Sequence, residues 1–387
     1  MDRSLRFFLN KFKQTPHSLR AVPHVNAPDD SCRCDLARLF HHYYVDTYGR
    51  CPPDPDPAHF EYARFLANRD DFRFAGDGIG VSTSARRNIS TTFGQAFCRW
   101  FLHEHLNITY FAHMDAVLNR NLHRGFGNLS LVRTTKGDAP DYVCAEDVDE
   151  VFMAEAKGRY SSISFTNSEF ATWRQQFSRV EVRDSRGQPR TVKGYIVGTR
   201  FTTEENTDSL RSAIYAEDPD SPGEEPLDSE LAQTLRAAVV AQHYVSVFQK
   251  LDQSLIAAAL ASATTVPNQL QLQATVWELQ LALPNMRFVG GYWPSPDGTL
   301  PFAIEDGRAI ARPPDPFRLN AGRGTFFGVE ESVFRQVAAV ARFGLQRAAD
   351  IRPLNDVAPF YSAISFLRDG TVIGPAEFFF PVDTISV

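Results

Sequence analysis

The segments APDYVCA at residues 139–145 and VFMAEAK at residues 151–157 decide the fold expected for this 387-residue chain. Both are short and rich in apolar residues, and an acidic turn separates them, which predicts two antiparallel strands in a hairpin. Side chains alternate between the two faces of a strand, so Glu155 and Lys157 project together. In such a hairpin the start of the first strand lies opposite the end of the second, which brings Asp141 beside Glu155.

Two carboxylates and an ammonium group at one spot predict a metal site. Close carboxylates repel each other, and buried charges are costly unless they are paired or bind a cation. Mg²⁺ prefers oxygen ligands and usually takes only one or two carboxylates from a protein, with water and substrate phosphate as the other ligands. Asp141, Glu155 and the peptide carbonyl of Ala156 would supply the protein ligands, with Mn²⁺ as the alternative ion. Lys157 would orient the attacking water or neutralise charge on the phosphorane, so the predicted reaction is phosphodiester hydrolysis.

These residues resemble the signature of the PD-(D/E)XK nuclease superfamily, which is met here by Pro140-Asp141, a spacer and Glu155-Ala156-Lys157. The chain that follows is also similar to that superfamily, because residues 166–180 have an apolar stripe at helical spacing and residues 193–201 have the composition of a buried strand. The resemblance covers residues 90–201. It implies an α/β, restriction-endonuclease-like fold, in which a mixed sheet is flanked by helices. It also implies that a glutamine on the helix, Gln175 or Gln176, helps to hold the site or the DNA.

A simpler interpretation of the same residues is a solvated hairpin. Asp141 would then cap a turn, and Glu155 and Lys157 would form a pair on an exposed face of a sheet. The ordered context of helix, hairpin, helix with glutamine and strand favours the nuclease interpretation, since the bare pattern of Asp, spacer and Glu-x-Lys arises by chance in acidic hairpins.

A helix is predicted to begin near Ser90, because apolar residues then repeat at steps of three and four as far as Phe101. Glu104 lies on the same stripe. The superfamily often places a further acidic site residue on this helix, so the resemblance makes Glu104 a candidate. Relatives frequently carry that glutamate just after an early glycine, and the residue after Gly94 is Gln95. The third site position is therefore Glu104 or Gln95, and the alternative for Glu104 is an ordinary charge in the last helical turn.

Basic residues follow the predicted site closely, although the net charge of the chain is −6. Residues 157–193 hold eight basic residues and three acidic ones. The candidates for binding phosphate in this segment are Arg159, Arg174 and Arg179, and the alternative is an ordinary solvated helix and loop. Residues 204–230 hold ten acidic residues and one basic residue, with several prolines, and are predicted to form an acidic loop or linker.

The nuclease core is predicted to span residues 90–203, with strands at 108–114 and 128–134, the second of them next to the hairpin. Residues 1–89 contain many prolines and are predicted to be an irregular region that packs on the core. Five residues of this region would form a zinc site only if the fold gathered them, since their spacing matches no familiar zinc module. They are Cys32, Cys34, Cys51, His41 and His42.

The remaining residues, 231–387, are predicted to be a mostly helical region that recognises substrate or a partner. The predicted helices span residues 231–263, 272–283 and 331–349, and a hairpin is predicted within residues 362–380.

Composition and cysteine count place the chain among ordinary globular proteins. No apolar run is long enough to cross a membrane, and the first residues lack the hydrophobic core of a signal peptide, which predicts a cytoplasmic protein with no membrane partner. The odd number of cysteines, five, predicts reduced thiols.

The resemblance implies a Mg²⁺-dependent nuclease that cleaves nucleic acid, with DNA favoured over RNA. Nucleases of this kind commonly serve in restriction, repair or anti-phage defence. Bacterial defence or restriction is therefore the expected role, with a protein partner or as a homo-oligomer. The alternative from another class is a catalytically inactive scaffold of the same fold that binds nucleic acid or a protein.

Overall fold

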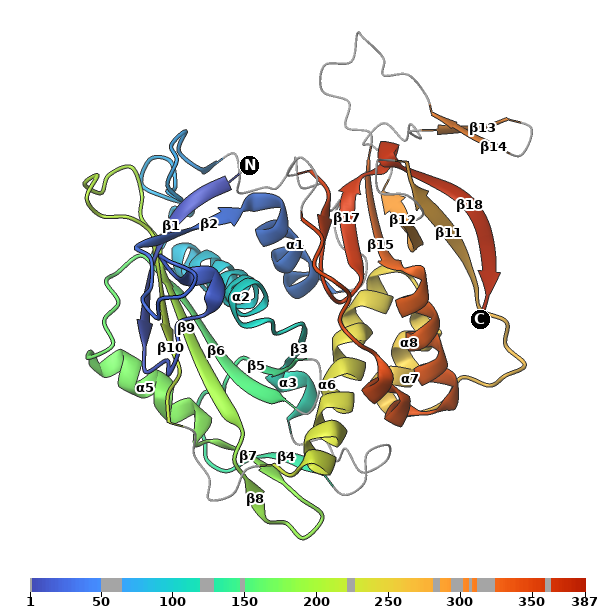
Figure 1. The fold of residues 1–387 in the computed structure, drawn as a ribbon, viewed down its shortest axis with the longest axis horizontal. Helices are drawn as coiled ribbons and strands as arrows, with labels where there is room; N and C mark the ends of the chain where they lie inside the picture. The colour runs from blue at the N-terminus through green and yellow to red at the C-terminus, as the bar shows by residue number, and fades with distance from the viewer. Residues whose placement is uncertain are drawn as a thin grey trace.

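Two lobes, each built on its own β-sheet, make up the chain (Figure 1). Helix α6 (Ser229–Lys250) lies between them and packs on the core sheet on one side and on the C-terminal helices on the other. The chain is therefore a mixed α/β protein. The structure is a computed structural model that describes residues 2–49, 65–118, 129–146, 150–220, 227–280, 286–293, 302–305, 308–311, 324–358 and 363–387.

The core lobe contains a seven-stranded mixed sheet in the order β2-β1-β10-β9-β6-β5-β3. Strand β1 runs parallel to β10 and β6 runs parallel to β9, whereas the other neighbours are antiparallel. The predicted hairpin is confirmed as β5 and β6. The strands of this sheet are β1 (Asp2–Asn10), β2 (Ser31–Asp35), β3 (Tyr110–His113), β5 (Tyr142–Ala145), β6 (Val151–Arg159), β9 (Lys193–Arg200) and β10 (Ala213–Glu217).

Helix α2 (Thr83–Leu106) packs on one face of this sheet through two glycines. A Cβ atom on Gly158 of β6 would lie 1.8 Å from the carbonyl oxygen of Ser90, and one on Gly94 would lie 2.4 Å from the amide nitrogen of Gly158. The helix and strand backbones approach so closely that only glycine fits at either position. This contact determines how far along β6 the helix lies.

Helix α5 (Ser168–Phe177) packs on the opposite face of the sheet. Its Trp173 lies against Gly198 of β9, and a second aromatic side chain of the helix lies against Gly194. The register places Gly198 next to Lys157. Since neighbouring residues of a strand point to opposite faces, Lys157 shares the face of α5, and Gly158 faces α2.

The first ninety residues are more regular than predicted. Strands β1 and β2 belong to the core sheet, and α1 (Leu36–Thr47) packs against α2. The prediction of an irregular region is therefore wrong for β1 and β2, because their partners lie far away in the sequence and composition does not reveal them. Residues 50–64, including Cys51, lie outside the described part of the chain.

The acidic segment 204–230 is also more ordered than predicted. Residues 213–217 form β10, which lies inside the core sheet between β1 and β9. Its Glu217 is fully buried and forms an ion pair with Arg174. The prediction of a loop or linker is wrong for β10. It assumed that all acidic residues of the segment face solvent, whereas Glu217 is buried and neutralised by Arg174. Residues 221–226 lie outside the described residues.

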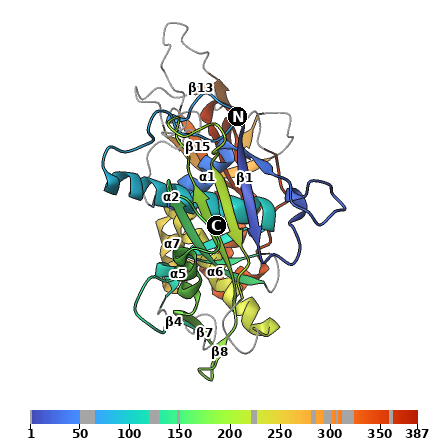
Figure 2. The same ribbon diagram turned by 90° about the vertical axis from the view of Figure 1, so that its left-hand side faces the viewer.

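A separate three-stranded sheet lies at the lower end of the molecule in both ribbon views (Figure 1 and Figure 2). It consists of β4 (Ser130–Arg133), β7 (Val180–Arg183) and β8 (Pro189–Arg190). The predicted strand at 128–134 is β4, but its expected place beside the hairpin is wrong. Strand β3 occupies that place, whereas β4 pairs with β7 and buries Leu131 opposite Val182.

The C-terminal lobe is not mostly helical as predicted, since it holds a six-stranded sheet in the order β16-β17-β15-β12-β11-β18. The segment 272–283, predicted as a helix, forms β11 (Gln273–Leu279) instead. The apolar residues of β11 are spaced as in a helix, but the strand pairs with β12 on one side and with β18 on the other, and this pairing determines its conformation. The other strands of this sheet are β12 (Arg287–Trp293), β15 (Thr325–Glu330), β16 (Ser365–Phe366), β17 (Thr371–Pro375) and β18 (Phe379–Ser386).

Other elements of this lobe agree with the sequence. The helical stretch at 231–263 forms α6 and α7 (Ser254–Ser262), and the stretch at 331–349 begins with α8 (Glu331–Phe343). The hairpin within 362–380 is confirmed as β16 and β17, with Gly370 at a φ of 85° in its turn. The remaining elements are α3 (Met114–Val117), the strands β13 (Phe302–Glu305) and β14 (Arg308–Ala311), and short 3-10 turns.

The structure also bears on the predictions about membrane-spanning helices and about the state of the cysteines. Among the described residues, no helix combines the length and apolar character that crossing a bilayer requires. The four described cysteines are free thiols, as predicted, namely Cys32, Cys34, Cys98 and Cys144.

Candidate active site

The hairpin of β5 and β6 brings Asp141, Glu155 and Lys157 together, as the sequence predicts. The register pairs Tyr142 with Ala154, which places Asp141 opposite Glu155. The Lys157 ammonium lies 3.9 Å from Oδ2 of Asp141 and forms an ion pair with Oε1 of Glu155. The alternative of a solvated surface pair is wrong, because the Glu155 side chain is completely buried.

Backbone geometry also supports Ala156 as a contributor to the site. Its N–H donates a hydrogen bond of 2.8 Å to Oδ2 of Asp141. The N–H and C=O groups of one strand residue point toward the same neighbouring strand, so the Ala156 carbonyl faces the side of Asp141 as well. Two carboxylates and one peptide carbonyl therefore converge, which is a donor set that suits a hard divalent cation.

Glu155 is the residue whose environment most needs explanation. Both carboxylate oxygens are buried, and Oε1 faces the Lys157 ammonium whereas Oε2 has no hydrogen-bond partner among the described residues. Burial raises the pKa of Glu155 well above its ordinary value, the nearby Asp141 raises it further, and Lys157 offsets these effects only in part. A buried acceptor without a donor is costly. A bound divalent cation would remove this cost, so the donor set fits a metal ion.

The electrostatics of Lys157 complement those of the two carboxylates. Burial lowers its pKa, but Glu155 and then Asp141 outweigh burial and raise the pKa above its ordinary value. The amine is therefore protonated at neutral pH and serves as a hydrogen-bond donor rather than as a base.

A polar pocket of about 350 Å³ opens in front of Asp141 and Lys157. Its wall combines carboxylates with cationic and amide donors, which suits a phosphate group held next to a metal ion. The lining residues are Gln95, His113, Met114, Asp115, Arg133, Asp138, Ala139, Pro140, Asp141 and Lys157.

The third site position is Gln95 rather than Glu104 in this structure. The Gln95 amide nitrogen lies 3.4 Å from Oδ1 of Asp141, in a long hydrogen bond. Glu104 belongs to a different group, because it binds Arg38 and His103. At 1.5 Å per residue, nine residues of helix put Glu104 roughly 13 Å along α2 from Gln95. The prediction of Glu104 as a residue of this site is therefore wrong.

The structure distinguishes the two glutamines of α5. Gln175 is exposed, whereas Gln176 is 2% exposed and lies on the inner side of the helix with Trp173. This side packs on the sheet face that carries Glu155 and Lys157. The Gln176 Oε1 atom is buried without a hydrogen-bond partner among the described residues. Gln176 is therefore the glutamine that the fold places beneath the site.

Of the three arginines predicted to bind phosphate, one is committed elsewhere. Arg174 donates two hydrogen bonds of 2.5 and 2.7 Å to the buried Glu217, so the prediction for this residue is wrong. Arg159 pairs with the exposed Glu169. Arg179 donates to the Asp138 carbonyl oxygen at 2.9 Å and thereby holds the loop that leads into the pocket.

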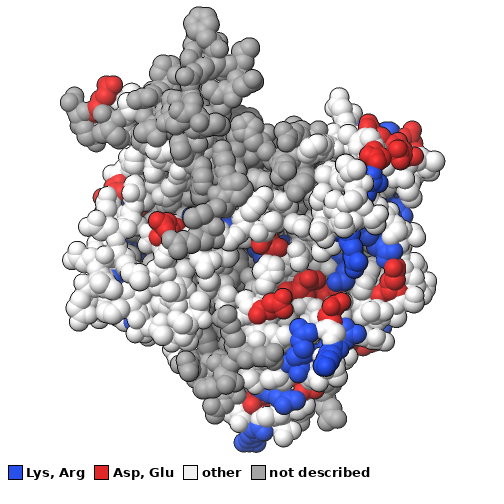
Figure 3. All heavy atoms as spheres, turned by 180° about the vertical axis from the view of Figure 1, so that it is seen from behind, with Lys and Arg blue, Asp and Glu red and all other residues white. Residues whose placement is uncertain are grey.

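Basic side chains gather over the lower end of the molecule when it is seen from behind (Figure 3). The strands at that end carry Arg133, Arg183 and Arg190, and Arg133 also lines the pocket. Acidic side chains lie beside these basic ones in the same view. Two of the arginines pair with acidic neighbours, Arg183 with Glu181 and Arg190 with Asp184.

A histidine that lines the same pocket, His113, is held by a buried aspartate behind it, and the sequence did not reveal either residue. Asp46 accepts hydrogen bonds from the Tyr142 hydroxyl at 2.8 Å and from Arg99 at 3.1 Å, and it lies 3.1 Å from Nε2 of His113. Burial opposes ionisation of Asp46, but His113 and Arg99 outweigh burial and hold its pKa at about 2. No motif links these residues, which come from α1 and β3.

His113 lies at the pocket wall, and Asp46 favours the charged form of its ring. Burial lowers its pKa, but Asp46 outweighs burial and raises the pKa above the ordinary value. Asp46 occupies Nε2, so Nδ1 is the ring nitrogen left for a ligand. A histidine whose charged form is favoured, in the same pocket as Lys157, is suited to a phosphate of a bound strand.

Replacing His113 with asparagine should weaken DNA binding by about tenfold, because one charge-assisted phosphate contact is lost. The slope of log affinity against log salt should fall by about one. Fluorescence anisotropy of a labelled duplex in Ca²⁺ measures both quantities. The exposed His24→Asn variant is the matched control, and equal salt slopes for the two variants would exclude a phosphate contact at His113.

The donors and acceptors of this site define its chemistry without help from homology. The chain matches no protein-family model, no curated protein and no solved structure. What the site can do must follow from its converging carboxylates, its protonated lysine and its polar pocket.

Proposed function

We propose that the chain is a Mg²⁺-dependent nuclease of the PD-(D/E)XK type, with Mn²⁺ as the alternative ion and DNA as the favoured substrate. The observation that supports this most strongly is the buried Glu155 carboxylate, which lies beside Asp141, pairs with the protonated Lys157 through Oε1 and has no partner for Oε2 among the described residues. The mixed sheet flanked by α2 and α5 is also in keeping with a restriction-endonuclease-like fold.

In this proposal each residue has a distinct task. Asp141, Glu155 and the Ala156 carbonyl would hold the ion, which when bound lowers the pKa of a water and polarises a phosphoryl oxygen. Lys157 would donate a hydrogen bond to the attacking water or to the phosphate as negative charge builds up. The water gives up a proton to solvent as its oxygen bonds to phosphorus, the bond from phosphorus to the leaving oxygen breaks, and solvent supplies the proton that the leaving oxygen takes up. Gln95 would hold Asp141 in place.

A catalytically inactive scaffold is the second candidate. The observation that favours it is Gln95, an amide at the position where the resemblance implies an acidic residue. Such a protein would bind nucleic acid or a protein partner through the same pocket without cleaving a phosphodiester bond.

Lys157→Ala separates the two candidates. Wild-type protein should cleave plasmid or linear DNA when Mg²⁺ is added and not when EDTA is present, and the variant should lose about 10²- to 10³-fold in rate, because a donor to the developing charge is removed. Gel assays with radiolabelled DNA and RNA measure the rate and the substrate preference. Lys13→Ala is the control, since Lys13 lines a different pocket. Equal behaviour of wild type and Lys157→Ala would favour the scaffold.

The biological role that we propose is anti-phage defence or restriction, together with a partner subunit or a second copy of the chain. The support is the resemblance of the hairpin, together with a C-terminal lobe that has its own sheet and is separate from the site. A phage infection assay that compares wild type with Lys157→Ala tests this role, and equal phage titres on the two strains would count against it.

A further inference from the structure

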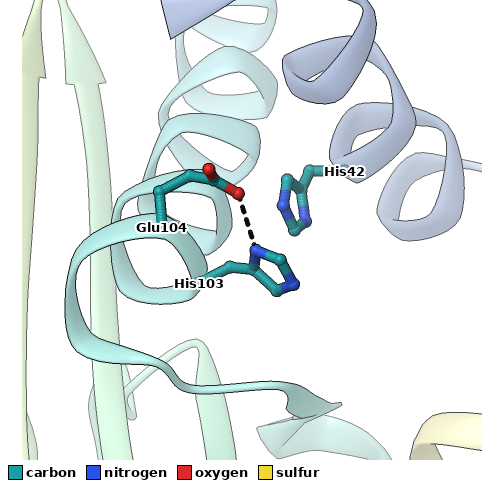
Figure 4. A group of neighbouring side chains, drawn as sticks. All are labelled: His42, His103 and Glu104. Carbon is teal, nitrogen blue, oxygen red and sulfur yellow. Dashed lines mark hydrogen bonds and ion pairs between the residues drawn. The ribbon is translucent and has the colours of Figure 1, made fainter. Parts of the chain in front are cut away.

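A second group of potential metal ligands lies inside the core lobe, away from the proposed nuclease site. It consists of His42 from α1 and of His103 and Glu104 from the last turn of α2, and their side chains point toward one another (Figure 4). One ligand atom from each residue lies within 4.8 Å of those of the other two.

His42 is the member of the group that lacks other partners. Its side chain is completely buried, and neither ring nitrogen has a hydrogen-bond partner among the described residues. Burial, and then the nearby His103, lower its pKa well below the ordinary value, so the ring is neutral. A neutral imidazole is the form that binds metal ions. By contrast, the adjacent and equally buried His41 has a hydrogen bond between Nδ1 and the Ser365 hydroxyl.

Glu104 supplies a charged oxygen to the same point. Burial raises its pKa, but His103 and Arg38 outweigh burial and hold the pKa at about 2, so the carboxylate is ionised. Its Oε1 atom lies 2.8 Å from Nδ1 of His103, and its Oε2 atom accepts a hydrogen bond of 2.7 Å from Arg38. One oxygen therefore faces the two histidines while a guanidinium anchors the other. Carboxylates that bind metal ions are commonly supported in this way.

We propose that His42, His103 and Glu104 bind one divalent transition-metal ion, for which zinc is the best fit. Two imidazoles and one carboxylate form a common donor set for zinc, whereas magnesium prefers oxygen ligands. Zinc bonds of about 2.0–2.1 Å place the ligand atoms of a tetrahedral site roughly 3.3–3.5 Å apart. The ligand atoms of the three residues now lie within 4.8 Å of one another, so small side-chain rotations would bring them to that spacing. When the ion binds Nδ1 of His103, the ring proton moves to Nε2, so the imidazole stays neutral and the long hydrogen bond of 3.4 Å that Nε2 accepts from the Arg368 N–H is given up. A water molecule is the fourth ligand.

The place of this site in the fold indicates a structural role. Arg38, which anchors Glu104, also binds Asp356 at 2.9 Å, and Arg368 binds the backbone carbonyl of His103. The group therefore lies where α1 and α2 meet segments of the C-terminal lobe. Zinc would join the two helices and stabilise the contact between the lobes. The proposal does not depend on nuclease activity.

Cysteines do not provide a competing site in the described part of the chain. No cysteine belongs to the group of potential ligands that the described residues form. The described cysteines are Cys32, Cys34, Cys98 and Cys144. Of the five N-terminal residues considered for a zinc site, His42 belongs to this cluster, the other described ones do not, and Cys51 lies outside the described residues.

Zinc binding to the metal-free full-length protein tests the proposal. After dialysis against a chelator and addition of a small excess of ZnCl₂, gel filtration and atomic emission should find one zinc per chain. The midpoint of thermal unfolding should rise by about 5 °C at saturating zinc. Co²⁺ in place of zinc should give the visible absorption bands of a tetrahedral ion.

Three variants decide the outcome. His42→Asn and Glu104→Gln should bind no zinc and lose the Co²⁺ bands, whereas His41→Asn, the matched control on the same helix, should keep one zinc per chain. If His42→Asn does not fold, Glu104→Gln decides alone, because its amide preserves the bond to Arg38. Zinc binding that is absent from wild type, or unchanged in Glu104→Gln, overturns the proposal. None of these measurements involves DNA cleavage, so failure here leaves the nuclease proposal untouched.

Discussion

Replacing Glu155 with glutamine is expected to lower Mg²⁺-dependent cleavage by about 10³-fold while making the metal-free protein more stable. The loss of activity follows because the amide cannot supply the charge that holds a divalent cation. The gain in stability follows because burial and the nearby Asp141 together outweigh the ion pair with Lys157, so the charged form of this completely buried side chain is disfavoured on balance. The amide takes the place of the protonated carboxyl, and the gain is the free energy that ionisation of Glu155 costs the folded protein.

The pH dependence of the gain has a definite sign. The pKa of Glu155 in the folded protein lies well above its ordinary value of 4.5, mainly because of burial. The folded state therefore binds this proton more tightly than the unfolded state, and wild-type stability is lost as pH rises from 4.5 toward the raised pKa. Glu155→Gln has no such loss, so the stability difference should be small near the ordinary pKa of a glutamate, should grow as the pH rises from there, and should level off above the raised pKa. Urea denaturation at several pH values, with EDTA present, measures it.

Magnesium provides the control for this variant. At 100 times the dissociation constant, an ion that binds only the folded state adds about 2.7 kcal/mol of stability. Wild type should therefore gain stability from Mg²⁺, and Glu155→Gln should not. An equal gain in both proteins would show that the ion binds elsewhere, and the metal-site assignment would then be wrong.

Gly158→Ala is expected to destabilise the core lobe by about 3 kcal/mol or more. A Cβ atom at this position would lie 1.8 Å from the Ser90 carbonyl oxygen, which is a backbone atom and cannot rotate away. Helix α2 would have to move away from β6, and insertion of even one methyl group into such a contact costs about 1–3 kcal/mol or more. The same movement would pull Gln95 away from Asp141, so cleavage should fall together with stability.

Gly291→Ala is the matched control, because Gly291 also lies in a strand and a Cβ atom added to it would have no neighbouring atom within 4 Å. Its free energy of unfolding should stay within about 0.5 kcal/mol of wild type. Chemical denaturation of the three proteins measures the difference, and a Gly158→Ala variant as stable as Gly291→Ala would refute the close packing of α2 on β6.

The sequence predicted the features of this protein that are local. The hairpin, the convergence of Asp141 with Glu155 and Lys157, and the helices at either end of the core depend on alternation and spacing within short segments. The same reasoning failed where pairing is distant. Nothing in residues 2–10 indicates that β1 pairs with β10, and the apolar spacing of β11 is compatible with a helix until its two neighbours are known.

The site shows the same division between local and distant information. The local excess of basic residues predicted that Arg174 binds phosphate. In the structure it pairs with the buried Glu217, which lies 43 positions later in the sequence. His113 and Asp46 escaped notice because no motif joins α1 to β3. Glu104 was predicted to belong to the site because it lies on the apolar stripe of α2. It is too far along the helix to reach Asp141, and it contacts His103 instead.

The pairing of β1 with β10 constrains how the chain folds during its synthesis. Asn10 and Glu217 are 207 residues apart and end as neighbours joined by a hydrogen bond. At about 5–20 residues per second, a ribosome needs roughly 10–40 s to make the intervening chain. For that time β1 has an unpaired edge in the place that β10 will fill, and an exposed strand edge invites aggregation. Expression at low temperature or together with a chaperone that holds nascent chains should therefore raise the soluble yield of this protein.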